Sequence, residues 1–95
     1  MLKHIMIDLE MNKIKKQYRD DKKLANELIE IGAVKMDDDF NEVDRYQSYV
    51  MPDYGKMDSH IIKLTGITDE KLEGAPRFKD AMQDFEKWIH GAWQI

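Results

Sequence analysis

Several residue types that would point to particular protein classes are missing or rare in this chain. It has no cysteine, which excludes a disulfide framework and a metal site built from thiolates. It has only two prolines, which argues against proline-rich and collagen-like sequences. No apolar run approaches the roughly 18 residues that a membrane-spanning helix needs. A carboxylate, Asp8, comes too early for a secretory signal peptide, and we therefore expect a soluble, cytoplasmic protein.

Charge is unevenly distributed along the 95 residues. The whole chain has a net charge of −4, which argues against general electrostatic attraction to nucleic acid or to membranes. Residues 13–23 nevertheless contain six lysines or arginines and two aspartates, a local charge of +4 (6 − 2). This stretch can be a solvated surface loop or an arm that contacts phosphates, and the sequence leaves both interpretations open.

The first half of the chain has the pattern of three β-strands. In residues 3–10 isoleucine and leucine alternate with other residues, which predicts a largely buried strand. Residues 27–36 are apolar on both faces and rich in β-branched types, as is typical of a central strand. Residues 45–50 form a third strand, and the Asp-rich residues 37–41 before it predict a turn. With residues 11–26 as a loop, the pattern predicts an antiparallel meander.

The second half of the chain has the pattern of helices. Asp58 or Ser59 can cap a short helix that ends at Gly66, and Thr68 can cap a further helical turn. The clearest helix is expected at residues 76–91, where apolar residues recur at helical spacing. We therefore predict an α/β fold, a three-stranded antiparallel meander followed by helices. Because one long helix cannot cover both faces of such a sheet, we expect the domain to be incomplete.

The strongest chemical signal is the pair Asp8 and Glu10. Residues two apart in a strand project from the same face, about 6.6 Å apart along the chain. Two carboxylates at this spacing repel each other unless a cation lies between them. Hard divalent ions such as Mg²⁺ and Mn²⁺ prefer oxygen ligands and suit such a pair. The alternative is that both are surface charges at the end of a strand.

The order of four segments resembles a known family. The segments Ile7–Met11, Glu27–Val34, Leu64–Thr68 and Pro76–Gly91 are together similar to the first half of the DEDD (DnaQ-like) 3′→5′ exonucleases, which have a ribonuclease H-like fold. Their details are most similar to the branch that contains the histone-mRNA exonucleases and the sporulation inhibitor KapD. The likeness covers essentially the whole chain.

This resemblance implies a site and a reaction. Asp8 and Glu10 match the first two ligands of a four-carboxylate site for two Mg²⁺ or Mn²⁺ ions. The implied reaction hydrolyses the terminal phosphodiester at the 3′ end of single-stranded RNA or DNA and releases nucleoside 5′-monophosphates. The positions that match nucleic-acid contacts are Leu9, Met11, Asn12, Leu64, Thr65 and Ile67. Asn12 stands where the family commonly has threonine, and ordinary helix-end packing is the alternative for Leu64 and Ile67.

The resemblance also predicts what this chain does not contain. The third and fourth acidic ligands of the family would lie beyond residue 95, so residues 1–95 are expected to be the N-terminal portion of one exonuclease domain and inactive by themselves. Two other hypotheses remain. The chain can be a non-catalytic module that binds a nucleotide or a partner, including a second copy through its uncovered sheet face. It can also be a structural protein in which Asp8 and Glu10 are surface charges.

Overall fold

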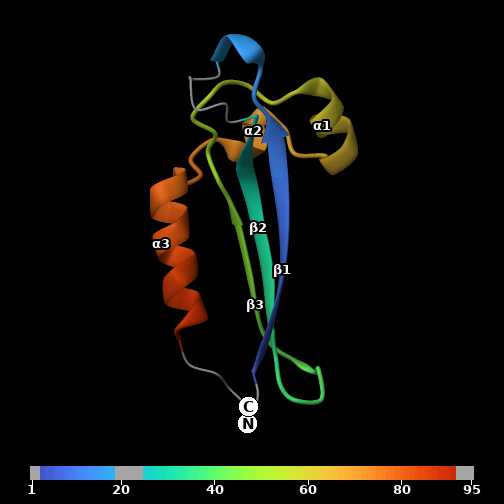
Figure 1. Ribbon diagram of the computed structural model, residues 1–95, viewed down its shortest axis with the longest axis vertical. Helices are drawn as coiled ribbons and strands as arrows, with labels where there is room; N and C mark the ends of the chain where they lie inside the picture. The colour runs from blue at the N-terminus through green and yellow to red at the C-terminus, as the bar shows by residue number, and fades with distance from the viewer. Residues whose placement is uncertain (1–2, 19–24, 92–95) are drawn as a thin grey trace.

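A computed structural model describes residues 3–18 and 25–91 of the chain. Three antiparallel strands form one sheet in the order β1-β2-β3, followed by three helices (Figure 1). The molecule is elongated, 48 × 26 × 24 Å. Within the described residues, no helix has the length and apolar character needed to cross a membrane. The elements are β1 (His4–Lys13), a 3₁₀ helix (Lys16–Tyr18), β2 (Asn26–Met36), β3 (Glu42–Tyr49), α1 (Ser59–Thr65), α2 (Asp69–Leu72) and α3 (Phe78–Ile89).

The turn between β2 and β3 is built around one aspartate. The Asp37 carboxylate accepts hydrogen bonds from the backbone N–H groups of Asp39, at 2.9 Å, and Asn41, at 3.0 Å. These bonds, that from Asn41 first, hold the pKa of the Asp37 carboxyl below its ordinary value. Phe40 takes a positive φ of 62° to complete the turn. The Asp-rich turn predicted from the sequence is confirmed.

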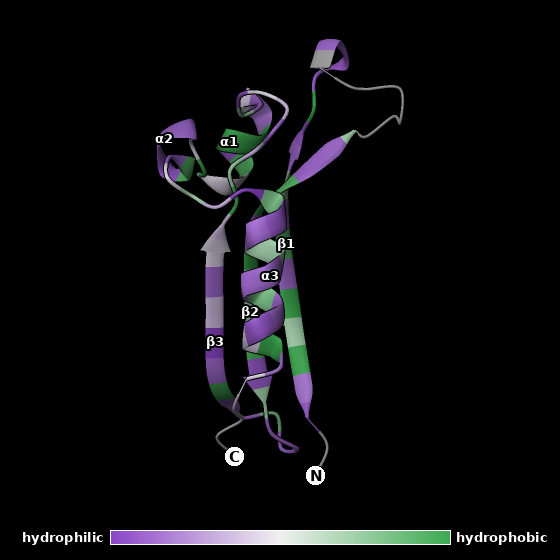
Figure 2. Cartoon of the chain, turned by 90° about the vertical axis from the view of Figure 1, so that its left-hand side faces the viewer, coloured by the Kyte–Doolittle hydropathy of each residue, from purple (hydrophilic) through white to green (hydrophobic). Residues whose placement is uncertain are grey.

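One face of the sheet packs against α3. The core on this face consists of Leu28, Ile31, Ala33, Val50, Ala81 and Phe85. Trp88 of α3 packs on Tyr46 of β3, with ring centroids 5.3 Å apart, and its indole N–H donates to Asp44 at 2.9 Å. Figure 2 shows α3 lying over β2, with β1 and β3 to either side. The helix therefore covers the middle of this face and leaves much of β1 open.

The opposite face is covered only near one end, by α1 and α2. Ile29 of β2 is fully buried there in a cluster with Met57, Ile67 and Leu72. A β-bulge makes this possible: Glu10 pairs with Glu30 and Met11 pairs with Leu28, so Ile29 has no partner on β1. A bulge bends a strand and redirects its side chains, and here it accompanies a second small core.

The caps of α1 and α2 are those expected from the sequence. The Asp58 side chain accepts hydrogen bonds from the backbone at the start of α1, and Thr68 does the same for α2. Gly66 ends α1 with φ +74°, a left-handed conformation that glycine adopts without strain. Cap residues are local signals, which is why both short helices could be placed from the sequence.

Several expectations about the elements need correction. β1 continues to Lys13, so residues 11–13 are not part of the loop, and β3 begins at Glu42 rather than at residue 45. The side chains of Ile7 and Leu9 are 49% and 48% exposed, so β1 is not a largely buried strand. The reason is that β1 pairs with β2 alone and α3 lies over β2. The long helix begins at Phe78 rather than at Pro76, because the Pro76 carbonyl accepts a hydrogen bond from the Met51 N–H at 2.8 Å.

Candidate metal and nucleic-acid site

Asp8 and Glu10 lie on the same face of β1. In the register of the sheet Asp8 is opposite Gly32 and Glu10 is opposite Glu30, with no irregularity between the two pairs. Their spacing along the strand is about 6.6 Å. Asp8 is exposed and Glu10 is half-buried. Within residues 3–18 and 25–91, neither carboxylate makes a hydrogen bond or an ion pair, so both are available to an external cation.

Glu30 is a third carboxylate on this face, directly across from Glu10. Side chains opposite each other in an antiparallel pair have Cβ atoms about 5 Å apart, so the two charges repel. Gln47 of β3 donates a hydrogen bond to the Glu30 carboxylate at 2.8 Å and ties it to the side away from β1. The Glu30 carboxylate therefore has its hydrogen-bonding partner within the sheet, on β3.

The carboxylates fit a divalent cation only as part of a ligand set. Mg²⁺ takes octahedral oxygen coordination and is commonly held by one or two carboxylates together with water and substrate phosphate. Asp8 and Glu10 supply two such groups, unengaged and on one face. The part of the chain that the structure describes contains no group of three or more histidines and carboxylates arranged to hold a metal ion.

Asn12 lies two residues beyond Glu10 and is buried, at 1% exposure. Its side-chain oxygen accepts a hydrogen bond from the Asp58 N–H at 2.9 Å, and its amide donates to the Lys56 carbonyl at 3.3 Å. Asp58 in turn caps α1. Asn12 therefore fastens the start of α1 beside the end of β1. These two hydrogen bonds of Asn12 could not be predicted from the sequence. They join residues 44 and 46 positions apart, and no local sequence pattern indicates such contacts.

The segment at the end of α1 holds the other predicted nucleic-acid positions. Leu64 is 69% exposed, so its side chain is accessible at the surface. Thr65 donates to the Ile61 carbonyl at 2.8 Å and accepts from the Ile67 N–H at 3.1 Å. Ile67 is buried at 3% exposure in the cluster with Ile29. Of the two apolar positions, Leu64 is open to a ligand and Ile67 is part of the packing.

Leu9 and Met11 alternate with the carboxylates and lie on the other face of β1. With Ile7 they border an apolar groove against Phe78 and Met82 of α3. We call these five residues the apolar strip. All five are exposed, at 37–52%. The side chains of Leu9 and Met11 thus lie away from the carboxylates, while their backbone belongs to the same strand.

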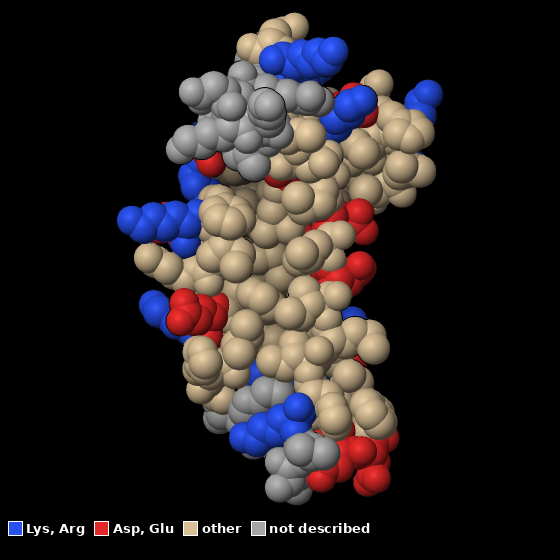
Figure 3. All heavy atoms as spheres, in the orientation of Figure 1, with Lys and Arg blue, Asp and Glu red and all other residues tan. Residues whose placement is uncertain are grey.

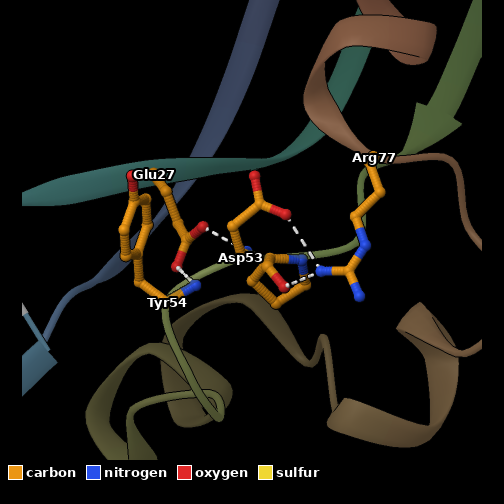
Figure 4. A network of polar contacts seen from close by, with 5 residues as sticks. Glu27, Asp53, Tyr54 and Arg77 are labelled. Carbon is orange, nitrogen blue, oxygen red and sulfur yellow. Dashed lines mark hydrogen bonds and ion pairs between the residues drawn. The ribbon is translucent and has the colours of Figure 1, made fainter.

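The loop after β3 is fixed by a small polar network (Figure 4). Glu27 accepts hydrogen bonds from the backbone N–H groups of Asp53, at 2.7 Å, and Tyr54, at 3.2 Å. Arg77 donates to the Pro52 carbonyl and pairs with the Asp53 carboxylate, both at 2.9 Å. This network holds the loop that leads to α1, and beside it lies a pocket of about 390 Å³ that Met11 helps to line.

Comparison with known proteins shows the family to which this chain belongs. Residues 5–95 match the model of the RNase T exonuclease family. The chain belongs to this exonuclease family. The resemblance to DnaQ-like exonucleases predicted from the sequence is thereby confirmed.

Curated relatives of this exonuclease family member are much longer proteins. The chain is 29% identical over 89 residues to a PolC-type DNA polymerase III of Staphylococcus haemolyticus, which covers 94% of this chain and 6% of the polymerase. It is 42% identical over 65 residues to the DNA polymerase III epsilon subunit of Haemophilus influenzae, which covers 68% of this chain and 25% of the subunit. The chain thus spans a quarter or less of these two relatives.

Solved structures establish the fold of this exonuclease family member. The nuclease domain of 3′hExo, a DEDDh family member bound to rAMP, matches with a TM-score of 0.75 and 24% identity over 92% of this chain and 43% of that one. A 3′-exonuclease structure concerned with recognition of the histone mRNA stem-loop matches with the same TM-score at 22% identity, covering 92% of this chain and 38% of that one. The predicted ribonuclease H-like fold, with its antiparallel meander and following helices, is confirmed.

Proposed function

We propose that this chain carries the first part of a 3′→5′ exonuclease site. In this proposal Asp8 and Glu10 hold divalent cations, Mg²⁺ or Mn²⁺, beside the 3′ end of single-stranded RNA or DNA. The single observation that carries the proposal is that two unengaged carboxylates share one face of β1 in a chain of the exonuclease family.

The chemistry of the donor set suits the reaction. When bound, a pair of divalent ions supplies a hydroxide from water for attack on the terminal phosphodiester and stabilises the leaving oxygen. Asp8 and Glu10 contribute two anionic oxygen donors and hold their end of the site on a rigid strand. The product of this reaction is a nucleoside 5′-monophosphate.

The terminal nucleotide is proposed to lie between β1 and α1. Leu64 is exposed on α1 and supplies an apolar surface for the terminal base. Thr65 and Ile67 hold the end of α1 in shape through a hydrogen bond and through burial. Leu9 and Met11 contribute their backbone on β1, and Asn12 acts by fixing α1 beside that strand.

Residues 1–95 are proposed to form the N-terminal portion of a single exonuclease domain that does not hydrolyse nucleic acid by itself. The described residues supply two available carboxylates and no cluster of three, whereas the implied site needs four. The chain covers 43% of the 3′hExo nuclease domain, which supports the same proposal. Nuclease activity of this chain that Asp8→Ala abolishes would contradict the inactivity.

The site is tested by binding of adenosine 5′-monophosphate with and without Mn²⁺. We expect Mn²⁺ to strengthen nucleotide binding, because the cation bridges the phosphate and the carboxylates. The double variant Asp8→Asn with Glu10→Gln should lose this Mn²⁺-dependent part. The matched control, Asp38→Asn with Asp80→Asn, removes two exposed charges elsewhere and should keep it. Equal behaviour of the two double variants would overturn the proposed site.

A second candidate function is favoured by the apolar strip. One edge of β1 has no strand partner among the described residues, and the five residues of the strip are exposed beside it. Exposed strand edges and contiguous apolar surface are features of protein-binding sites. The second candidate is therefore a non-catalytic module that associates with another chain, including a second copy, through this face of the sheet.

A further inference from the structure

Beyond the two carboxylates, β1 continues into a basic arm. We use this name for Lys13, Lys15 and Lys16, the lysines at the end of β1 and the start of the 3₁₀ helix. All three are exposed. Figures 1 and 2 both show this segment projecting from the end of the sheet, beyond the body of the molecule.

The base of the arm is anchored. Ile14, between the first two lysines, is buried at 1% exposure, and its N–H donates to the Ala25 carbonyl at 2.8 Å. The lysines therefore project from an anchored stretch of backbone rather than from a free tail. This anchoring favours an arm that contacts phosphates over a solvated surface loop.

The positive charge of the arm extends onto the neighbouring loop, and the carboxylate that lines the hollow of the three lysines, Asp58, caps α1. Within the described residues none of the three lysines, nor the exposed Lys56, makes an ion pair. Lys15 and Lys56 line one hollow together with Tyr54 and with Asp53, whose carboxylate is paired with Arg77. The space-filling view shows lysine and arginine spheres at the upper end of the molecule, with acidic spheres lower on its right side (Figure 3).

The distance between the arm and the two carboxylates corresponds to a few nucleotides of a nucleic-acid strand. Lys13 is three residues beyond Glu10, about 10 Å along the strand at 3.3 Å per residue, and by strand alternation it lies on the face of Leu9 and Met11. Lys15 and Lys16 follow beyond the end of β1, where this alternation no longer applies. A stacked nucleic-acid strand advances about 3.4 Å per nucleotide, so the arm begins within the first few nucleotides from the proposed 3′ end. Because the whole chain is acidic, local cations are needed to attract a polyanion.

We propose that the basic arm, together with Lys56, binds the phosphates of single-stranded nucleic acid a few nucleotides before its 3′ end. This inference rests on the proposed function, which puts the 3′ end at Asp8 and Glu10. Lysine contacts phosphate as a point charge and reads neither base nor sugar, so the arm binds RNA and DNA alike.

The arm is tested with oligonucleotides of two lengths. Binding of fluorescent dT2, dT8 and rU8 to the 95-residue chain is measured by anisotropy across a salt series. The double variant Lys15→Gln with Lys16→Gln should weaken dT8 and rU8 about tenfold. It should also reduce the slope of log affinity against log salt by about 1.4, at 0.7 per phosphate contact on a single strand. Binding of dT2 and of adenosine 5′-monophosphate should not change.

The matched control is Lys79→Gln with Lys87→Gln, which removes the same charge from exposed positions on α3. It should bind dT8 within twofold of the unaltered chain. If both double variants lose the same affinity for dT8, the effect comes from net charge alone and the proposal is overturned. Unchanged dT8 binding in the arm variant would also overturn it. If Mn²⁺-dependent nucleotide binding fails while the arm variant still loses dT8, the proposed metal site is wrong and the arm stands.

Discussion

At the scale of single residues, Tyr46 has the most strongly perturbed ionisation among the described residues. Partial burial raises the pKa of its phenol to about 12, and the hydrogen bond it donates to Asp84 at 2.7 Å acts in the same direction. The ring also packs against Phe85 and Trp88 in the main core. Its ionisation is therefore coupled to the docking of α3 on the sheet.

This coupling predicts how stability depends on alkaline pH. The folded pKa lies above the value of 10.0 expected for an unperturbed tyrosine, so the folded state keeps the phenolic proton longer than the unfolded state. The Tyr46 contribution is complete below pH 10 and is lost as pH rises from 10 towards 12. In urea unfolding at pH 9 and pH 11, Tyr46→Phe should lose less stability between the two values than the unaltered chain. An identical loss in both proteins would contradict the assignment.

At the scale of elements, the position of α1 depends on one buried amide. Asn12 is the link between β1 and the start of α1, through the Asp58 N–H and the Lys56 carbonyl. A buried N–H that loses its acceptor costs about 1–3 kcal/mol. The placement of α1 therefore rests on a contact that joins distant parts of the chain.

Asn12→Ala should lower the free energy of unfolding by about 1–3 kcal/mol, because it leaves the Asp58 N–H without its acceptor. Hydrogen exchange should also accelerate at the start of α1 more than in the centre of β2. Urea unfolding and amide exchange measure the two effects. Asn26→Ala, at an exposed asparagine, is the control and should stay within about 0.5 kcal/mol of the unaltered chain. No change in exchange at residues 58–62 would contradict the role of Asn12.

Some features of these elements could be predicted from the sequence, and others could not. The three strands, the Asp37 turn, both helix caps and the shared face of Asp8 and Glu10 follow from local patterns, and all appear in the structure. The bulge at Ile29, the Asn12 tie and the later start of α3 arise from contacts between distant segments. Periodicity carries no information about such contacts.

At the scale of the whole molecule, the sheet is unevenly covered. α3 lies on one face and α1 and α2 lie near one end of the other, while β1 keeps an unpaired edge in the described part of the chain. The apolar strip, with 37–52% exposure at each residue, lies between β1 and α3 on the face that α3 covers in part. Such a surface favours association through added strands or packed apolar side chains.

We expect the 95-residue chain to self-associate at high concentration. Leu9→Lys should weaken association, because it places a charge in the middle of the strip without disturbing the buried core. Sedimentation equilibrium from 10 to 300 μM measures the effect, and Leu64→Lys, at an exposed leucine on α1, is the control. A monomer over the whole range, or equal effects of both substitutions, would contradict a role for the strip.

Joint binding of a divalent cation by Asp8 and Glu10 can be measured residue by residue through the paramagnetic broadening that Mn²⁺ causes. At low Mn²⁺ the amide signals of residues 8–10 and of their neighbours across the sheet, Glu30 and Gly32, should broaden first, and Asp8→Asn with Glu10→Gln should remove this broadening. Broadening that begins instead at the acidic turn of residues 37–39, or that persists in the double variant, would contradict this joint binding.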